Sequence, residues 1–252
     1  ELNYVNAVLD GFIKSYYANG QLDNEAFQRN GSKEGYFKKY YENGQLETSG
    51  NYTKGTLNGN VVSYYQSGAI KKDLKLVNGY KIGINKEFFE NGKIQIETDY
   101  SNNEKDKTIK SFDIEGNIIS EEYYEDGKKS GTWNYYFDKG KINVKENYAL
   151  GKLDGKRLTY DEKENVIKEE TFIKGKKHGI ETLFHLNGTP AEILNYTFDR
   201  LDGAYQKLSK TEKLEIEDEY LRNMKNGEWK YYNKKGEIER TENYKLGKLL
   251  DN

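Results

Sequence analysis

The sequence predicts an all-β protein: an elongated, single-layer antiparallel β-meander, or solenoid, of about ten β-hairpin repeats of 24 residues. Glycine recurs at a fixed interval along the 252 residues, and aromatic and aliphatic residues keep fixed places between the glycines. The chain also holds 25 glycines but one proline. Glycine supplies the positive φ of tight turns, whereas proline is excluded from the interior of paired strands. An array of short hairpins satisfies all three observations.

The repeat emerges when the chain is divided every 24 residues from Gly11. Ten repeats begin without insertion at residues 11, 35, 59, 83, 107, 131, 155, 179, 203 and 227, and nine of these ten marks are glycine. A partial repeat at residues 1–10 precedes them. We therefore expect one repeat array over residues 1–252, without separate domains. Positions within a repeat are numbered below as offsets from its mark.

Two turns divide each repeat into two strands. Offset twenty is glycine or, in its place, Asn or Asp, the residues that best tolerate a positive φ. Offset nine is usually glycine and in four repeats follows Asn, and Asn-Gly between strand-like runs is a strong hairpin signal. The glycines expected to form these turns are Gly20, Gly31, Gly44, Gly55, Gly68, Gly79, Gly92, Gly127, Gly140, Gly151, Gly175, Gly188, Gly236 and Gly247.

Strand pairing assigns the side chains to two faces. A two-residue turn at offsets eight and nine places offset six opposite the aliphatic residue at offset eleven, on the same face as offsets two and seventeen. The other face collects mostly charged residues at offsets twelve, fourteen and sixteen, with the aromatic residue of offset five. A β-bulge would change the face of offset five.

The aromatic-rich face is the predicted binding surface. Its rings are expected to stack on neighbouring repeats, and some are expected to stay accessible because a single-layer sheet has no second layer to cover them. The residues of this predicted surface are Tyr17, Phe37, Tyr41, Tyr65, Phe89, Trp133, Phe137, Tyr205 and Trp229.

The repeated unit resembles the MORN-repeat variant, found in bacterial proteins often labelled as antitoxin components. Residues 35–46 and 227–232 carry the resemblance most closely, and it extends over residues 4–250. It implies hairpin repeats in an extended array and an interaction or membrane-associated module. Pro190 stands in the aliphatic place of its repeat and is expected to interrupt the ladder there. Regular hairpins are least expected in repeats seven to nine, which depart from the pattern at Asp161, Glu164, Pro190, Ser209 and Glu212.

Composition excludes several classes of protein. The 40 Lys and Arg residues nearly cancel the 42 Asp and Glu residues, and the net charge of −2 argues against a nucleic-acid binder, which needs a basic surface. No apolar run approaches the ~18 residues of a transmembrane helix. The absence of Cys removes thiolate metal sites, and an aromatic content of 14% argues against disorder.

No catalytic or metal site is expected. His178 and His185 occupy different places in the repeat and lack the spacing of a zinc-binding helix. Adjacent carboxylates such as Glu169 and Glu170 point to opposite faces of a strand and do not converge on one substrate. We therefore expect no enzyme activity, no cofactor and no metal.

Two functional hypotheses follow. The first is a non-catalytic scaffold for protein–protein interaction, including one that binds and neutralises a partner protein such as a toxin. The alternative is a cell-surface or membrane-associated module that binds phospholipid headgroups or cell-wall carbohydrate. Lys-rich connections such as Gly151-Lys152 and Gly175-Lys176 would attract phosphate, although Lys at turns also protects sheet edges. The absence of Cys and a composition rich in Tyr, Asn and Lys favour an exported, periplasmic or cell-surface protein over a cytoplasmic one. Met224 is the only methionine, so the chain that begins at Glu1 lacks an initiator, either because a leader was removed or because the chain was shortened.

Overall fold

The computed structural model describes residues 1–250. Contacts between Cα atoms group the chain into two compact units, Glu1–Gly127 (unit 1) and Lys128–Asn252 (unit 2). Within the described residues each unit consists of β-strands joined by turns, with one short 3₁₀ helix and no α-helix. The units are described separately.

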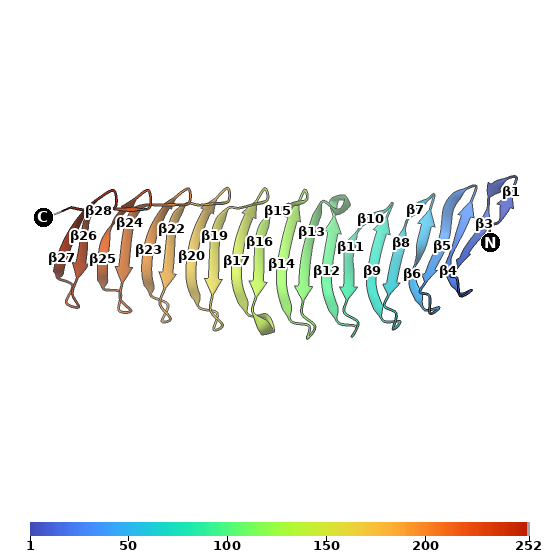
Figure 1. Ribbon diagram of the computed structural model, residues 1–252, viewed down its shortest axis with the longest axis horizontal. Helices are drawn as coiled ribbons and strands as arrows, with labels where there is room; N and C mark the ends of the chain where they lie inside the picture. The colour runs from blue at the N-terminus through green and yellow to red at the C-terminus, as the bar shows by residue number, and fades with distance from the viewer. Residues whose placement is uncertain (251–252) are drawn as a thin grey trace. The chain divides into compact units, whose positions relative to one another are not determined.

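In unit 1 the strands follow one another in chain order, each antiparallel to its neighbours (Figure 1). The first two strands pair only with each other. The elements are β1 (Tyr4–Val5), β2 (Val8–Leu9), β3 (Gly11–Tyr16), β4 (Leu22–Arg29), β5 (Ser32–Tyr40), β6 (Leu46–Thr53), β7 (Thr56–Leu57), β8 (Gly59–Tyr64), β9 (Ile70–Val77), β10 (Tyr80–Lys81), β11 (Gly83–Phe88), β12 (Ile94–Ser101), η1 (Asn102–Glu104), β13 (Asp106–Phe112) and β14 (Ile118–Glu125).

Unit 2 has the same meander order. Its elements are β15 (Lys128–Lys129), β16 (Gly131–Tyr136), η2 (Asp138–Gly140), β17 (Ile142–Ala149), β18 (Lys152–Leu153), β19 (Gly155–Tyr160), β20 (Val166–Ile173), β21 (Lys176–Lys177), β22 (Gly179–Phe184), β23 (Pro190–Thr197), β24 (Arg200–Leu208), β25 (Leu214–Leu221), β26 (Met224–Tyr232), β27 (Ile238–Lys245) and β28 (Lys248–Leu249). The predicted all-β antiparallel meander of hairpin repeats is thus confirmed within each unit.

The turn glycines have the backbone geometry that their positions require. Each glycine predicted to form a turn has a positive φ, from 73° at Gly127 to 88° at Gly236. Asn103, Asp199 and Asn223, which replace glycine at offset twenty, have φ of 52°, 69° and 70°. Offset nineteen is also left-handed in each repeat, so two successive residues of positive φ form each tight turn.

The strand register differs from the predicted one near the turn at offsets six to ten. Offsets zero to four pair as predicted, beginning with Gly83 opposite Tyr100, but a β-bulge then places Phe88, at offset five, opposite Ile94, at offset eleven. Offset six instead opens the turn: in the repeat from residue 35, the amide of Tyr41 donates to the carbonyl of Gln45 at 2.8 Å. The predicted two-residue turn and the pairing of offset six with offset eleven are therefore wrong, and the bulge is the cause.

Pro190 does not interrupt the ladder. It is the first residue of β23 and lies opposite Phe184, a position where a strand tolerates a residue without an amide hydrogen. Repeats seven to nine form hairpins like the others. Glu164 and Glu212 adopt φ of 65° and 60° in the place that glycine holds elsewhere.

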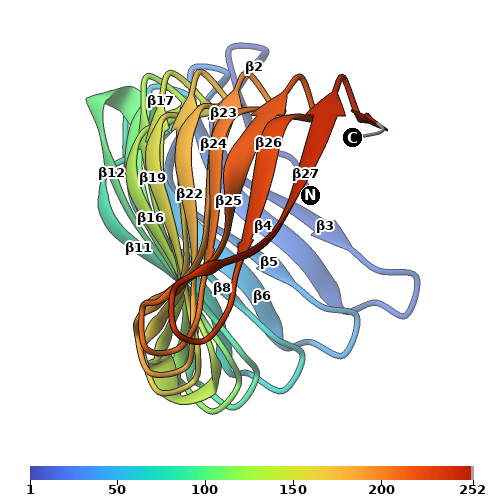
Figure 2. The same ribbon diagram turned by 90° about the vertical axis from the view of Figure 1, so that its left-hand side faces the viewer.

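Burial is confined to one face of the sheet. Paired residues share a face, so offsets two, four, thirteen, fifteen and seventeen form one side, the inner face, and offsets one, three, five, fourteen and sixteen form the outer face. The strands of both units are bent along their length (Figure 2). The buried residues all lie on the inner face: Ala26, Gly50, Val61, Leu76, Asn85, Thr98, Ser120, Trp133, Glu146, Glu170, Phe172, Glu181 and Trp229.

Side chains of neighbouring repeats pack so closely on this face that Gly50 has no room for a side chain. A Cβ added to Gly50 would lie 2.8 Å from Cε1 of Phe37 and 2.9 Å from Cγ2 of Val61, closer than non-bonded carbon atoms approach. Gly50 pairs with Phe37 across β5 and β6. The inner face is therefore a packed core made by side chains of neighbouring repeats, without a second layer.

Candidate functional site

The predicted aromatic binding surface is largely covered. None of its residues is exposed, and Trp133 and Trp229 are each 2% exposed. Phe37, Tyr205 and the two tryptophans occupy offset two on the inner face, whereas Tyr17, Tyr41, Tyr65, Phe89 and Phe137 occupy offset six in the turns. The first group therefore lies within the strands and the second in the turns.

The tyrosines at offset six bridge neighbouring repeats. The hydroxyl of each donates a hydrogen bond to the carbonyl at offset five of the next repeat. His185 makes the equivalent contact, with Nε2 2.9 Å from the carbonyl of Leu208. The three bridging tyrosines and their acceptors are Tyr17 with Tyr40, Tyr41 with Tyr64, and Tyr65 with Phe88, at 2.6 to 2.7 Å.

Lysine ammonium groups cover the aromatic rings of the inner face. Nζ of Lys225 lies 4.0 Å from the ring centroid of Trp229 and 4.8 Å from that of Tyr244. Lys129 makes the same two contacts with Trp133 and Tyr148. Cations over aromatic faces are attracted by the ring quadrupole, so these lysines and rings stabilise one another and leave little ring surface for a partner.

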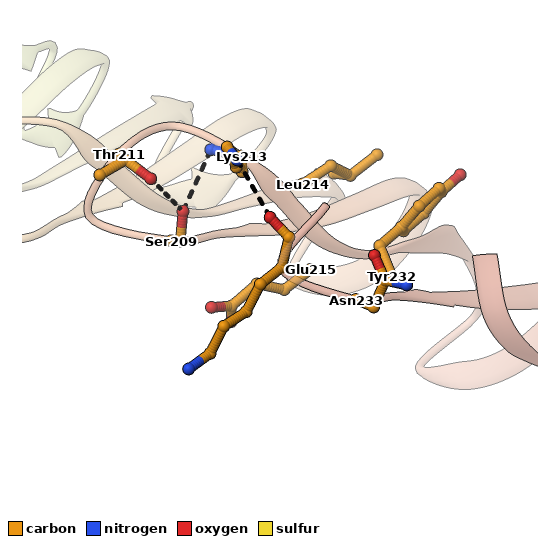
Figure 3. Close-up of a pocket in the computed structure, with 8 residues that line it drawn as sticks. Ser209, Thr211, Lys213, Leu214, Glu215, Tyr232 and Asn233 are labelled. Atoms are coloured by element: carbon orange, nitrogen blue, oxygen red, sulfur yellow. Dashed lines mark hydrogen bonds between the residues drawn. The ribbon is translucent and has the colours of Figure 1, made fainter. Parts of the chain in front are cut away.

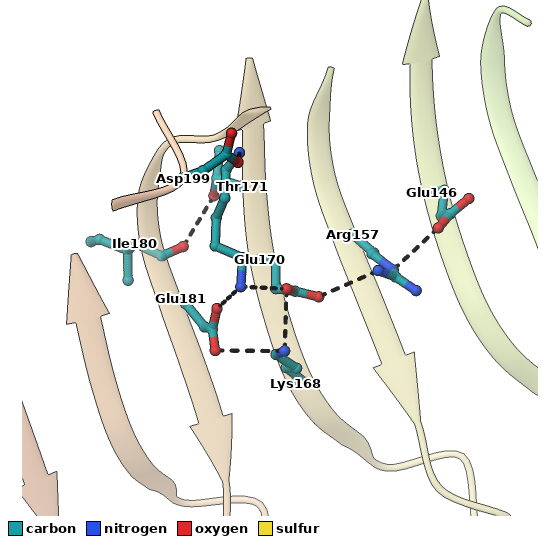
Figure 4. Close-up of polar contacts among 9 residues, drawn as sticks. Glu146, Arg157, Lys168, Glu170, Thr171, Ile180, Glu181 and Asp199 are labelled. Carbon is teal, nitrogen blue, oxygen red and sulfur yellow. Dashed lines mark hydrogen bonds and ion pairs between the residues drawn. The ribbon is translucent and has the colours of Figure 1, made fainter. Parts of the chain in front are cut away.

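A network of ion pairs lies on the inner face of unit 2 (Figure 4). Nζ of Lys177 lies 2.8 Å from Glu170 and also contacts Glu181, and Nζ of Lys168 contacts the same two carboxylates at 3.2 and 3.6 Å. Arg157 joins Glu170 to Glu146, with Nε 3.1 Å from the Glu146 carboxylate. Each charged group of the network lies within 4.0 Å of an opposite charge, and the network connects strands β17 to β22.

The charges of this network are mutually stabilised. Burial alone would raise the pKa of Glu170, but hydrogen bonds from Lys177 and Lys168 outweigh it and hold that pKa below its usual range. Burial alone would lower the pKa of Lys177, but hydrogen bonds to Glu170 and Glu181 raise it. Both groups therefore stay charged at neutral pH, which suits a structural network rather than proton transfer.

Asp218 is different because its inner carboxylate oxygen lacks a partner. Oδ1 accepts a hydrogen bond from the amide of Glu219 at 2.7 Å, whereas Oδ2 is buried without a hydrogen bond. Burial raises the pKa of this carboxyl group. Glu217, Glu228, Tyr205 and Lys230 line the same shallow hollow.

The histidines and adjacent carboxylates do not form a metal or catalytic centre. The ring of His178 packs against Phe198, with centroids 4.7 Å apart, while His185 contacts a backbone carbonyl. Glu169 pairs with Lys156 on the outer face, and Glu170 belongs to the inner network. Over residues 1–250, no group of three His, Cys, Asp or Glu side chains is placed to hold a metal ion.

Exposed rings gather on the outer face of unit 1. The ring centroids of Phe12 and Phe27 lie 5.2 Å apart, and those of Phe12 and Tyr36 lie 5.6 Å apart. Phe12 and Tyr36 are exposed. This three-ring cluster was not among the predicted site residues, because offset one is aromatic only in the first two repeats and offset sixteen only at Phe27 and Tyr123.

One edge of unit 2 combines positive charge with exposed apolar side chains. The tight-turn edge of unit 2 consists of residues 149–152, 173–176, 197–200, 221–224 and 245–248. Successive turns lie side by side because the amide at offset twenty donates to a carbonyl of the preceding turn, as from Gly175 to Leu153 and from Gly247 to Lys225. The edge holds seven Lys and Arg residues and one acidic residue, Asp199.

The other turns of the molecule do not carry the excess of positive charge that this edge has. The wider turns at offsets six to ten of unit 2 hold seven cations and six anions, and the tight turns of unit 1 up to Gly127 hold two cations and three anions. Within the described residues none of the seven cations of the tight-turn edge forms an ion pair. These seven are Lys152, Lys174, Lys176, Arg200, Arg222, Lys245 and Lys248.

Apolar side chains stand at strained, exposed positions of the same edge. Leu150, Phe198 and Leu246 have φ of 51°, 48° and 47° and are 81%, 53% and 51% exposed. A left-handed backbone costs a non-glycine residue ~1–2 kcal/mol, and the equivalent places in unit 1 hold Asn or Asp at most turns. Strain of this kind persists mainly where function requires the residue.

The lysines of these turns are recognisable in the sequence, but the apolar row was missed. The signal lies at offset nineteen, where Asn30, Asn78 and Asn102 in unit 1 give way to Leu150, Phe198 and Leu246 in unit 2. The sequence pattern predicts a turn at that position, but it does not predict that the side chain there is exposed and apolar.

Comparison with known families supports the repeat assignment. Five segments, residues 9–30, 33–54, 81–102, 177–197 and 225–246, match the family model described as "MORN repeat variant". Each begins two residues before a repeat mark, so the matches keep the 24-residue register. These segments are similar to the MORN repeat variant. They cover less than half of the chain, and the MORN-like pattern elsewhere rests on the hairpins described above.

The other comparisons add little. No curated protein matches the chain. One solved structure that it resembles is the "Crystal Structure of TcdB2-TccC3-Cdc42", with 12% sequence identity and a TM-score of 0.17, over 91% of this chain and 16% of that chain. The MORN-like chain thus spans less than a fifth of that protein, and the likeness is too low to support an argument. Among the described residues no helix is long and apolar enough to cross a membrane.

Proposed function

We propose that this MORN-like chain is a non-catalytic repeat scaffold that docks on an anionic lipid surface through the tight-turn edge of unit 2. The observation that carries the proposal is that seven cations, without ion pairs to any residue of 1–250, lie along the same edge as exposed Leu150, Phe198 and Leu246. Basic side chains near a negatively charged bilayer contribute about 1 kcal/mol each, and apolar side chains add burial in the headgroup region.

The strained turns favour this function over simple solubility. Lys alone at an edge would protect it from pairing with other chains, but exposed Leu and Phe at positive φ lower both stability and solubility. An interface that buries them offsets that cost. The near-neutral opposite edge gives the unit one preferred side towards a negative surface.

Vesicle sedimentation tests the proposal directly. The chain is expected to sediment with phosphatidylcholine vesicles that contain phosphatidylserine and to remain in solution with phosphatidylcholine alone. The double variant Lys174→Gln/Lys176→Gln should bind the anionic vesicles about 30-fold more weakly, since two lysines contribute about 2 kcal/mol. Lys234→Gln/Lys235→Gln, which removes two exposed lysines from the opposite edge, is the matched control and should bind normally. Equal loss in both variants, or binding unaffected by salt, contradicts the proposal.

A second candidate function is binding of another protein through the three-ring cluster of unit 1. Exposed, rigid aromatic side chains in contact with one another are typical of hot spots at protein interfaces. Neutralisation of a partner protein would be one outcome of such binding. Phe12, Phe27 and Tyr36 are the residues that support it.

Photo-crosslinking distinguishes this candidate. A crosslinking amino acid placed at Tyr36 should capture one defined protein from native extract, and Phe12→Ser should abolish capture. The same crosslinker at Asn60, the equivalent outer-face position two strands along, is the control and should capture nothing. Capture of the same protein from both positions contradicts a site centred on the three rings.

A further inference from the structure

Three junctions between repeats have no ring at offset six, because Asp113, Asp161 and Ser209 stand there. Ser209 occupies offset six of the ninth repeat, where Tyr17, Tyr41, Tyr65 and His185 each reach the carbonyl at offset five of the next repeat. The hydroxyl of Ser209 instead contacts Oγ1 of Thr211 at 3.1 Å and accepts the amide of Lys213 at 3.1 Å. The short side chain is thus held in its own turn and does not cross to the next repeat.

A groove of about 560 Å³ lies at this junction (Figure 3). Its walls are offsets six, eight and ten to twelve of one repeat and offsets five to seven of the next. Leu214 and the ring of Tyr232 supply apolar surface, and Nζ of Lys213 closes one end by donating to the carbonyl of Lys234 at 3.0 Å. The remaining lining residues are Ser209, Thr211, Glu215 and Asn233.

The groove is larger than one ring requires. Its volume lies within the ~300–1,000 Å³ of small-molecule pockets, so it has room for an aromatic side chain together with flanking backbone. The carbonyl of Tyr232 stands at the offset that accepts the tyrosine hydroxyl in the other junctions, at 2.6 to 2.7 Å. The occupant that fits both features is a phenol ring carried on a polypeptide.

We propose that the groove at Ser209 binds a tyrosine side chain of another polypeptide, whose ring takes the place of the missing bridging tyrosine and whose hydroxyl donates to the carbonyl of Tyr232. The binding mode copies a contact that the chain itself makes three times. It is independent of the lipid-docking edge, because the groove opens among the wider turns rather than the tight ones.

The junctions after Asp113 and Asp161 do not offer the same site, and the Asp113 carboxylate accepts hydrogen bonds from the amide and side chain of Asn117. Asp161 also replaces the bridging tyrosine, but its carboxylate accepts hydrogen bonds from the amide and side chain of Asn165, which lower its pKa. A charged carboxylate in the ring position disfavours an apolar ring. Ser209 is neutral and small, so its groove accepts one.

The test uses the short peptide N-acetyl-Ala-Tyr-Ala-amide and amide chemical shifts of the full chain. The peptide is expected to shift amides of residues 209–215 and 232–234 in a saturable manner. The Phe-containing peptide should bind roughly 2- to 10-fold more weakly, because it lacks one hydrogen bond of ordinary strength. Free phenol should shift the same amides with lower affinity, since it lacks the flanking backbone.

Variants keep the test decisive. Ser209→Tyr should fill the groove, abolish peptide binding and raise the thermal midpoint, whereas Ser209→Ala should leave binding intact. Tyr41→Ser should create a second, equivalent groove in unit 1 and add peptide-induced shifts there. Unchanged binding in Ser209→Tyr, shifts located elsewhere, equal affinity for the Phe peptide, or phenol binding as tightly as the Tyr peptide would each overturn the proposal.

Discussion

The hydroxyl of Tyr41 donates a hydrogen bond to the carbonyl of Tyr64, 23 residues further along the chain, at 2.7 Å. The bond joins the wide turn of one repeat to the strand end of the next. In a repeat protein, stability is approximately a sum of terms within repeats and terms between neighbours. Tyr41 contributes to the terms between neighbouring repeats. It does so through its hydroxyl oxygen, whose role the pattern of hydrophobic residues does not predict.

Tyr41→Phe should lower the stability of unit 1 by about 0.5–1.5 kcal/mol, the net contribution of one hydrogen bond, while leaving the ring in place. Thermal unfolding monitored by circular dichroism measures the change. Tyr16→Phe is the matched control, because Tyr16 is exposed and should be neutral. Equal effects of the two substitutions would show that the bridge contributes nothing.

Trp229→Ala should destabilise unit 2 by about 3–5 kcal/mol, the usual cost of truncating a buried large aromatic side chain. The indole packs against the rings of Tyr205 and Tyr220 and under the ammonium group of Lys225. Urea unfolding measures the loss. Tyr80→Ala, which truncates an exposed ring, should cost far less, and a small effect at Trp229 would contradict its assignment to the core.

Glu170→Gln should destabilise unit 2 at neutral pH by about 1.5–3 kcal/mol, the range for hydrogen bonds to charged groups. The folded-state pKa of Glu170 lies below the unfolded value. Its stabilising contribution is therefore complete above the unfolded pKa of ~4.3 and is lost as the pH falls through the folded pKa. The difference between wild type and variant should shrink in acid, as measured by urea unfolding across that range.

The control for Glu170 is its neighbour on the other face. Glu169→Gln removes an exposed ion pair with Lys156 and should change stability by less than about 1 kcal/mol. A difference between wild type and Glu170→Gln that stays constant into strong acid would show that the carboxylate charge is not responsible.

Asp218→Asn should stabilise unit 2 at neutral pH, because the buried oxygen Oδ2 has no partner and the charged form is poorly solvated. Burial raises the folded-state pKa of Asp218 above its unfolded value. The penalty is therefore present above the folded pKa and disappears as the pH falls through the unfolded pKa, so the gain of about 1 kcal/mol should vanish in acid. Thermal midpoints at several pH values measure it. A loss of stability at neutral pH would mean that the carboxylate has a partner.

Leu150→Asn should separate stability from binding. Asn tolerates the left-handed backbone of offset nineteen, and an Asn directly before Gly151 favours a hairpin turn, so stability should rise by about 1 kcal/mol. Binding to anionic vesicles should weaken at the same time, because an apolar side chain is lost from the tight-turn edge. Lys54→Asn, a substitution at the same offset in unit 1, should change stability without affecting vesicle binding. Unchanged vesicle binding by Leu150→Asn would show that Leu150 does not take part in docking.

The sequence determines the repeat and its tight turns but not the wide turn. At offset twenty only Gly, Asn and Asp occur, which directly reports a left-handed backbone. At the wide turn the pattern Tyr-Tyr-x-Asn-Gly is compatible with two registers that differ by one residue. A bulge between Glu87 and Phe88 on one strand decides between them. Its energy depends on contacts with the next repeat, which local sequence does not encode.

Those contacts explain why Asn precedes the glycine. Oδ1 of Asn19 accepts the amide of Gln21 within the turn, and Nδ2 donates to the carbonyl of Glu42 in the next repeat. Asn187 repeats the second contact with Lys210 at 2.9 Å. Such a residue was predicted as a turn former only, and its second role depends on a neighbour 23 residues away.

The candidate site was harder to predict than the fold for the same reason. Some aromatic residues at offset two were expected to stay accessible because a single-layer sheet has no cover. Trp133 and Trp229 are instead buried beneath the ammonium groups of Lys129 and Lys225 and belong to a core, and Phe37 and Tyr205 are half-buried. The exposed apolar residues lie where periodicity predicts only turn formers.

The amide of offset twenty bonds backwards to the preceding turn, as from Gly55 to Lys33, and the hydroxyl of Tyr41 bonds forwards to the following repeat. Each 24-residue block thus carries, on the side of each neighbour, the donors and acceptors that complete the hydrogen bonds with that neighbour. If a whole block such as residues 35–58 is duplicated or deleted, the donors of one block still meet the acceptors of the next. Such an array can change length in whole blocks without a new turn or a new core having to evolve, whereas an insertion of any other length would break both joints.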